Sequence, residues 1–184
     1  MKKIAIVYYS KNGTTDALAK AIASGAESRG AEVFSHRIQG EEIIGGRFKN
    51  DALFERLLDA DAIIFGVPTY MGGPAAQFKA FADASSNAWS KQLWRNKLAA
   101  GFTIGSSPCG ELQSTIEYFY LLASQHSMLW VGIDSPDGTD LTNFNRLNAS
   151  VGVIALDDEQ DGINAIDRRT AVRLGERVAE VLTQ

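Results

Sequence analysis

Short apolar runs separate amphipathic stretches along most of this chain. The runs at 4–9, 62–67 and 98–104 are rich in β-branched and aromatic residues, and weaker runs occur at 32–35, 128–133 and 151–155. The first run does not alternate between apolar and polar positions, which is typical of a strand buried on both faces. The stretches 39–46 and 135–148 are polar and predict loops.

Between the runs, apolar residues recur at helical spacing. The pattern predicts helices at about 15–28, 75–86, 111–125 and 165–183, and a further helical stripe at Leu53, Phe54, Leu57 and Leu58. Strands and helices in alternation predict an α/β doubly wound domain with a parallel sheet and helices on both faces. Residues 1–184 contain no linker or repeat, so we expect one domain.

Ligands of such sheets bind outside the carboxyl ends of the strands, which directs attention to three loops. The first, 10–15, offers the hydroxyls of Ser10, Thr14 and Thr15 at the start of a helix. Unpaired backbone N–H groups and the helix dipole favour an anion there, so the loop predicts a phosphate site. The alternative is a plain helix N-cap, for which Thr14 or Thr15 would suffice.

Other phosphate-binding or acidic sites of this fold class do not fit the first loop. The sequence contains neither G-x-G-x-x-G nor G-x-x-x-x-G-K-[ST]. The first and third strands are followed by Tyr9-Ser10 and Val67-Pro68, so no carboxylates stand there for a magnesium site.

The second loop, 68–73, places an aromatic and a thioether side chain between a proline and two glycines. Thr69, Tyr70 and Met71 suit contact with a flat ring, although an ordinary turn would also explain them. The third loop, 105–111, is small and hydroxyl-rich and holds the one cysteine, Cys109. A phosphatase loop would need Arg at position 115, where Thr115 stands, so we interpret Cys109 as a cavity-lining residue.

Composition narrows the class of protein further. One cysteine in 184 residues excludes an intrachain disulfide and favours a reducing compartment. A net charge of −4 without a basic cluster argues against nucleic-acid binding. No run approaches the roughly 20 apolar residues of a transmembrane helix, and we expect a cytoplasmic protein. The two histidines, His36 and His126, lie far apart and form no metal-binding spacing, so no metal site is expected.

Two segments resemble a known family. The stretch 6–15 (IVYYSKNGTT) is similar to the first strand and FMN phosphate loop of flavodoxin-like flavoproteins, and 61–70 (DAIIFGVPTY) to their third strand and flavin-ring loop. The sequence resembles most closely the WrbA-type NAD(P)H:quinone oxidoreductases and related NADPH-dependent FMN reductases, over nearly the whole chain. The resemblance implies a three-layer, five-stranded parallel sheet with strand order 2-1-3-4-5.

The resemblance also implies site residues. The implied FMN contacts are Ser10, Lys11, Asn12, Gly13, Thr14 and Thr15 at the phosphate, Pro68, Thr69, Tyr70, Met71 and Gly72 along the ring, the third loop Ser106, Ser107, Pro108, Cys109, Gly110 and Glu111, and His126 near the flavin. Tyr70, Trp89 and His126 would shape the substrate pocket.

The implied function is an FMN-dependent oxidoreductase that passes electrons from NAD(P)H to a quinone-like or other small acceptor. No residue is assigned as a catalytic acid or base. The alternative is a flavodoxin-type electron carrier that docks to redox proteins, with Asp157, Asp158, Glu159 and Asp161 as the candidate docking patch. The resemblance also implies that this protein forms a homodimer or homotetramer.

Overall fold

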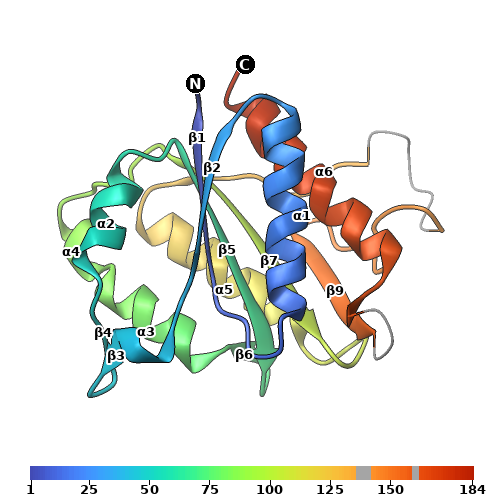
Figure 1. The fold of residues 1–184 in the computed structure, drawn as a ribbon, viewed down its shortest axis with the longest axis horizontal. Coiled ribbons are helices and arrows are strands. Elements are labelled where there is room, and N and C mark those ends of the chain that lie inside the picture. The colour runs from blue at the N-terminus through green and yellow to red at the C-terminus, as the bar shows by residue number, and fades with distance from the viewer. Residues whose placement is uncertain (136–141, 159–161) are drawn as a thin grey trace.

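A twisted parallel sheet forms the middle layer of the molecule (Figure 1). This computed structural model describes residues 1–135, 142–158 and 162–184. The parallel strands lie in the order β2 (Glu32–Arg37), β1 (Lys3–Tyr8), β5 (Ala62–Tyr70), β7 (Leu98–Gly105) and β9 (Val153–Asp158). This is the strand order 2-1-3-4-5 expected from the sequence. A short strand β10 (Gly162–Ile163) pairs antiparallel with β9 at the edge.

The fifth position in the sheet is divided between two segments of the chain. β8 (Leu129–Trp130) pairs with the beginning of β7, whereas β9 pairs with the end of β7 from Phe102 to Gly105. The expected strand at 128–133 is therefore only two residues long, and the run at 151–155 supplies most of the fifth strand instead of adding a sixth. The chain after β8 and the chain before β9 lie side by side, because the Ile133 N–H donates to the Ser150 carbonyl over 3.0 Å.

Helices cover both faces of the sheet, as the sequence predicts. α1 (Thr14–Ser28) and α6 (Ala165–Val181) lie on one face, and α2 (Asp51–Leu58), α3 (Ala76–Ala84), α4 (Ser86–Ser90) and α5 (Leu112–Gln125) on the other (Figure 1). Alternate residues of β1 serve the two cores: Ile4 and Ile6 pack toward α1 and α6, and Ala5 and Val7 toward the opposite face.

Two segments predicted as loops form hairpins. Within 39–46, a 3₁₀ turn (Gly40–Glu42) leads into β3 (Ile43–Ile44), which pairs with β4 (Arg47–Phe48). β5 likewise continues through Pro68 to Tyr70 and pairs with β6 (Gly73–Pro74). Met71 and Gly72 form the turn with φ values of 48° and 75°, the two left-handed conformations that a type I′ hairpin turn needs.

The predicted helix at 75–86 is also interrupted. α3 ends at Ala84, and α4 begins at Ser86. The Ser85 hydroxyl bonds the Ala82 carbonyl over 2.7 Å at this junction, a local bond of the kind with which serine competes against helical hydrogen bonding.

Candidate functional site

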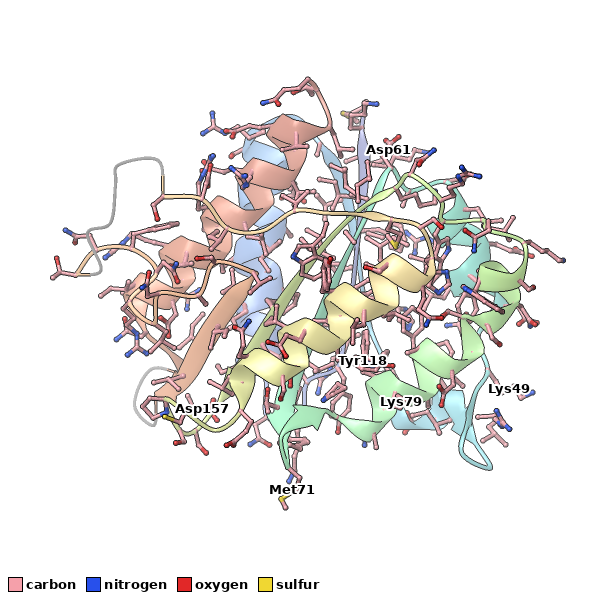
Figure 2. All side chains as sticks on the ribbon, turned by 180° about the vertical axis from the view of Figure 1, so that it is seen from behind. Lys49, Asp61, Met71, Lys79, Tyr118 and Asp157 are labelled. Atoms are coloured by element: carbon pink, nitrogen blue, oxygen red, sulfur yellow. The ribbon has the colours of Figure 1, made fainter. Side chains whose placement is uncertain are left out.

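The three candidate loops lie at one edge of the sheet, which we call the carboxyl edge. Figure 2 shows Met71 at the tip of its hairpin and Asp157 near the end of β9 at this edge, with Asp61 at the opposite edge. The second loop contacts the first turn of α5, directly after the third loop, because the Ser114 hydroxyl bonds the Gly72 carbonyl over 2.6 Å. The first loop joins them through β1, whose successor Tyr9 donates its N–H to the Gly66 carbonyl.

Ser10 organises the first loop. It is buried, and its hydroxyl oxygen accepts the N–H groups of Gly13 at 3.0 Å and Asp16 at 3.4 Å. Gly13, at φ +94°, stands at the N-cap of α1 and has no side chain to cap the helix, so the Ser10 hydroxyl takes the Asp16 N–H in its place. The N-cap alternative for Thr14 or Thr15 is therefore wrong.

Thr15 fits an anion ligand at this helix end. Its side chain is fully buried in the first turn of α1, and its hydroxyl has no hydrogen-bond partner among the described residues. A buried hydroxyl without a partner costs free energy, so its presence in the first turn of a helix suits an acceptor from outside the chain, such as a phosphate. The phosphate site at this loop stays a prediction, and Thr15 is the side-chain donor on which it depends.

Charges around the loop are arranged to tolerate that anion. The Arg37 guanidinium donates to the Ser10 carbonyl over 2.6 Å, which brings a cation to the loop from β2. Asp16, the acid of the first helical turn, is paired with Lys20 at 2.7 Å and accepts the Tyr8 hydroxyl at 2.5 Å. Burial alone would raise the pKa of Asp16, but the bonds from Lys20 and Tyr8 hold it below its usual value.

The hairpin tip presents an aromatic ring and a thioether to solvent. Tyr70 is 43% exposed, and Met71 extends fully from the tip (Figure 2). Burial raises the pKa of Tyr70, with smaller contributions from the nearby Tyr9 and Asp157. Thr69 differs from the expectation, because its hydroxyl points into the protein and bonds the Thr103 hydroxyl at 2.8 Å. Only Tyr70, Met71 and the tip backbone are presented as the sequence predicts.

The third loop is more open than its composition suggested. Ser106, Ser107, Pro108 and Cys109 are all exposed, and Cys109 is a free thiol at the surface. The interpretation of Cys109 as a cavity-lining residue stays a prediction. Glu111 adopts φ 53° immediately before α5, which begins without a side-chain cap.

His126 and Trp89 do not join these loops within one chain. α5 starts at the carboxyl edge and has 14 residues, so its far end, where His126 stands, is about 20 Å away. Trp89, in α4, lines a cavity of about 380 Å³ with His126 and Tyr118. The expectation that Tyr70, Trp89 and His126 form one pocket is wrong for a single chain, because a helix separates the places they occupy.

The buried contacts of His126 are those of a core residue. Its ring stacks on the buried Trp94 with the centroids 4.2 Å apart, and Nε2 lies 2.9 Å from the Ser85 hydroxyl. Because the one hydroxyl proton of Ser85 goes to the Ala82 carbonyl, Nε2 carries the imidazole proton and donates it. Nδ1 is buried without a partner among the described residues, and burial lowers the pKa of His126 to about 4.

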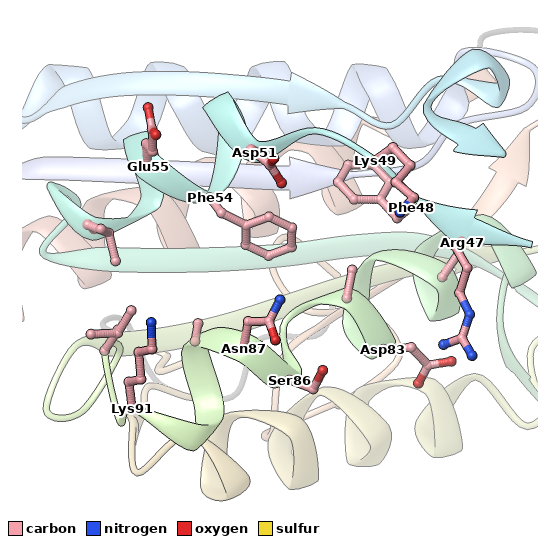
Figure 3. Close-up of a pocket in the computed structure, with 15 residues that line it drawn as sticks. Arg47, Phe48, Lys49, Asp51, Phe54, Glu55, Asp83, Ser86, Asn87 and Lys91 are labelled. Atoms are coloured by element: carbon pink, nitrogen blue, oxygen red, sulfur yellow. The ribbon is translucent and has the colours of Figure 1, made fainter.

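The structure also forms a cavity that sequence reasoning missed. It has a volume of about 520 Å³ and lies between α2 and the α3–α4 segment, with Phe54 facing its centre and Arg47 and Lys91 at its two ends (Figure 3). No local pattern marks it, because its walls come from segments that are distant in sequence.

Comparison with known proteins now decides the family. A family model described as NADPH-dependent FMN reductase matches residues 1–133. The chain belongs to this family. It is therefore an NAD(P)H-dependent oxidoreductase that works with FMN.

Full-length similarities agree with this family. "Flavodoxin FldP" of Pseudomonas aeruginosa is 35% identical over 98% of this chain and 97% of its own length. An "NAD(P)H dehydrogenase (quinone)" of Archaeoglobus fulgidus is 34% identical over the same shares. The crystal structure of a flavodoxin, WrbA-like protein from Agrobacterium tumefaciens matches with a TM-score of 0.76 and 38% identity, covering 100% of this chain and 99% of that one. No helix of the described segments is long and apolar enough to cross a membrane.

Proposed function

We propose that this FMN reductase family member passes electrons from NAD(P)H to a quinone or a similar small acceptor, with FMN bound at the carboxyl edge. The observation that supports the binding site is the buried hydroxyl of Thr15 in the first turn of α1, which has no hydrogen-bond partner among the described residues. FMN, when bound, supplies the electron-transfer chemistry, and the protein supplies its placement.

The proposed roles follow the positions of the loops. Loop 10–15 holds the FMN phosphate through backbone N–H groups and Thr15, while Arg37 adds positive charge nearby. The tip residues Tyr70 to Gly72 and the loop 106–111 lie along the flavin ring. Tyr70, the more exposed aromatic at this edge, borders the space in which the acceptor approaches.

The names of two relatives support a quinone as the acceptor. Besides the Archaeoglobus protein, an "NAD(P)H dehydrogenase (quinone)" of Sinorhizobium fredii is 36% identical over 72% of this chain. The second candidate function, a flavodoxin-type carrier, is supported by the full-length similarity to "Flavodoxin FldP". Of its candidate docking patch, Asp157 is exposed in β9, and 159–161 lie outside the described residues.

Two measurements test the proposal. The purified protein, or the colourless protein after addition of FMN, should show flavin absorption bands, and absence of any FMN binding refutes the site. Steady-state oxidation of NADH and NADPH is then followed with and without benzoquinone. Turnover that depends on the quinone supports the enzyme, whereas FMN binding without such turnover supports the carrier.

We further propose a homodimer or homotetramer. Trp89 is 46% exposed and Leu121 60% exposed, and both line the same cavity between α4 and α5. Exposed apolar side chains that lie close together are typical of a surface that contacts another chain. Light scattering should give a mass that is a multiple of 19.9 kDa, and Leu121→Asp should lower it. A wild-type mass of one chain contradicts the proposal. The cytoplasmic location stays a prediction from the single cysteine.

A further inference from the structure

A hydroxyl network lies directly behind the hairpin that carries Tyr70 and Met71. The Thr69 hydroxyl is 2.8 Å from the Thr103 hydroxyl and 2.7 Å from the Thr115 hydroxyl. Thr103 and Thr115 are fully buried, and their hydroxyls, unlike that of Thr15, have hydrogen-bond partners within the protein. The network joins three elements, because these residues belong to β5, β7 and α5.

The proton count gives the network one direction. The Thr103 hydroxyl donates to the Val67 carbonyl over 2.8 Å, and a hydroxyl has only one proton. Thr103 must therefore accept from Thr69, and Thr69 must in turn accept from Thr115. The resulting chain runs from Thr115 through Thr69 and Thr103 to Val67, and aligned hydroxyls of this kind strengthen one another.

A second contact holds the outer end of the hairpin. The one proton of the Ser114 hydroxyl is shared between the Gly72 carbonyl, 2.6 Å away, and the Glu111 carbonyl, 2.5 Å away, so it bridges the hairpin tip and the start of α5. Met71 and Glu111, which flank this bridge, both have positive φ. Non-glycine residues keep such conformations only where neighbouring structure enforces them.

We propose that Thr103, Ser114 and Thr115 are positioning residues that fix the hairpin tip for the ring half of FMN. This inference rests on the proposed binding site. The three residues form a clamp from α5 and β7 onto the tip, and they act through the tip without touching the flavin. The phosphate half depends instead on loop 10–15, to which the hydroxyls of the three clamp residues make no hydrogen bond in the described structure.

The test separates the two halves of the ligand by comparing FMN with riboflavin, which lacks the phosphate. Thr115→Val keeps the side-chain shape and leaves the donor of Thr69 satisfied, so the protein should still fold. We expect both dissociation constants to rise by the same factor, about fivefold to tenfold, the size expected for one neutral hydrogen bond. Thr15→Val should weaken FMN while leaving riboflavin unchanged.

Ser114→Ala gives an independent variant of the clamp with the same expected pattern. Its matched control is Ser124→Ala, since the Ser124 hydroxyl lies on the same helix and bonds only the Tyr120 carbonyl within it. Melting temperatures distinguish the positioning role from a role in stability alone. In the second case the variants would melt at a lower temperature, and the folded protein would bind riboflavin as tightly as the wild type. That result overturns the inference alone. If the wild type binds neither flavin, the proposed site is refuted and the inference with it.

Discussion

Replacing Thr15 with valine should change stability and cofactor affinity in opposite directions. Thr15 is fully buried, and its hydroxyl has no partner in the described parts of the ligand-free chain. Valine fills nearly the same space without a polar atom. The substitution therefore removes a penalty from the ligand-free protein and a donor from the phosphate-bound one.

The two effects can be given a size. A buried hydroxyl without a partner costs about 1–3 kcal/mol, so Thr15→Val should stabilise the ligand-free protein by about 1–2 kcal/mol. For a domain of this length, this corresponds to a melting temperature about 2–8 °C higher. A hydrogen bond to a charged group contributes about 1.5–3 kcal/mol, so the FMN dissociation constant should rise about 10- to 150-fold.

The assay pairs thermal unfolding of flavin-free protein with titration of FMN by flavin fluorescence. Thr183→Val is the matched control, because Thr183 is exposed near the C-terminus and, among the described residues, its hydroxyl bonds only the Glu180 carbonyl. It should change neither quantity. A Thr15→Val protein that melts at a lower temperature without FMN, or that binds FMN as tightly as the wild type, would refute the assignment of Thr15 to the phosphate.

Two further predictions concern the core. Gly175→Ala should destabilise the protein by about 3 kcal/mol or more, because the new Cβ would lie 1.9 Å from the Ile22 carbonyl oxygen. Chemical denaturation measures this loss of stability. Gly40→Ala is the control, because a Cβ at Gly40 would meet open space and should leave the stability unchanged. Burial holds the pKa of His126 near 4, so the unfolded chain binds one more proton between pH 6.5 and pH 4, and stability should fall by about 1.4 kcal/mol per pH unit as the pH drops through that range. His126→Gln should flatten that part of the stability profile, and parallel profiles for the two proteins would show that His126 is not the group responsible.

Local pattern was enough to predict the layers of this fold. Unbroken apolar runs such as 62–67 mark strands buried on both faces, and they occupy the centre of the sheet as expected. The loop after β1 could be singled out because its hydroxyls stand in a few adjacent residues at a helix start, and its assignment to a phosphate stays a prediction. The division of the fifth strand was not predictable, since β8 and β9 compete for one edge of β7 and only the docked chain decides how they share it.

The sequence by itself determined the alternation of strands and helices, the three candidate loops and the family resemblance, because hydrophobic period and short motifs are properties of neighbouring residues. The strand order was implied by that resemblance and not by the periodicity. Only the tertiary structure decided that Ser10 replaces a helix cap, that Thr69 turns inward to Thr103, and that His126 lies a helix length from the loops. Each of these depends on which distant backbone and side-chain groups meet when the layers pack, and hydrogen bonds between residues far apart in the chain leave no periodic signal in it.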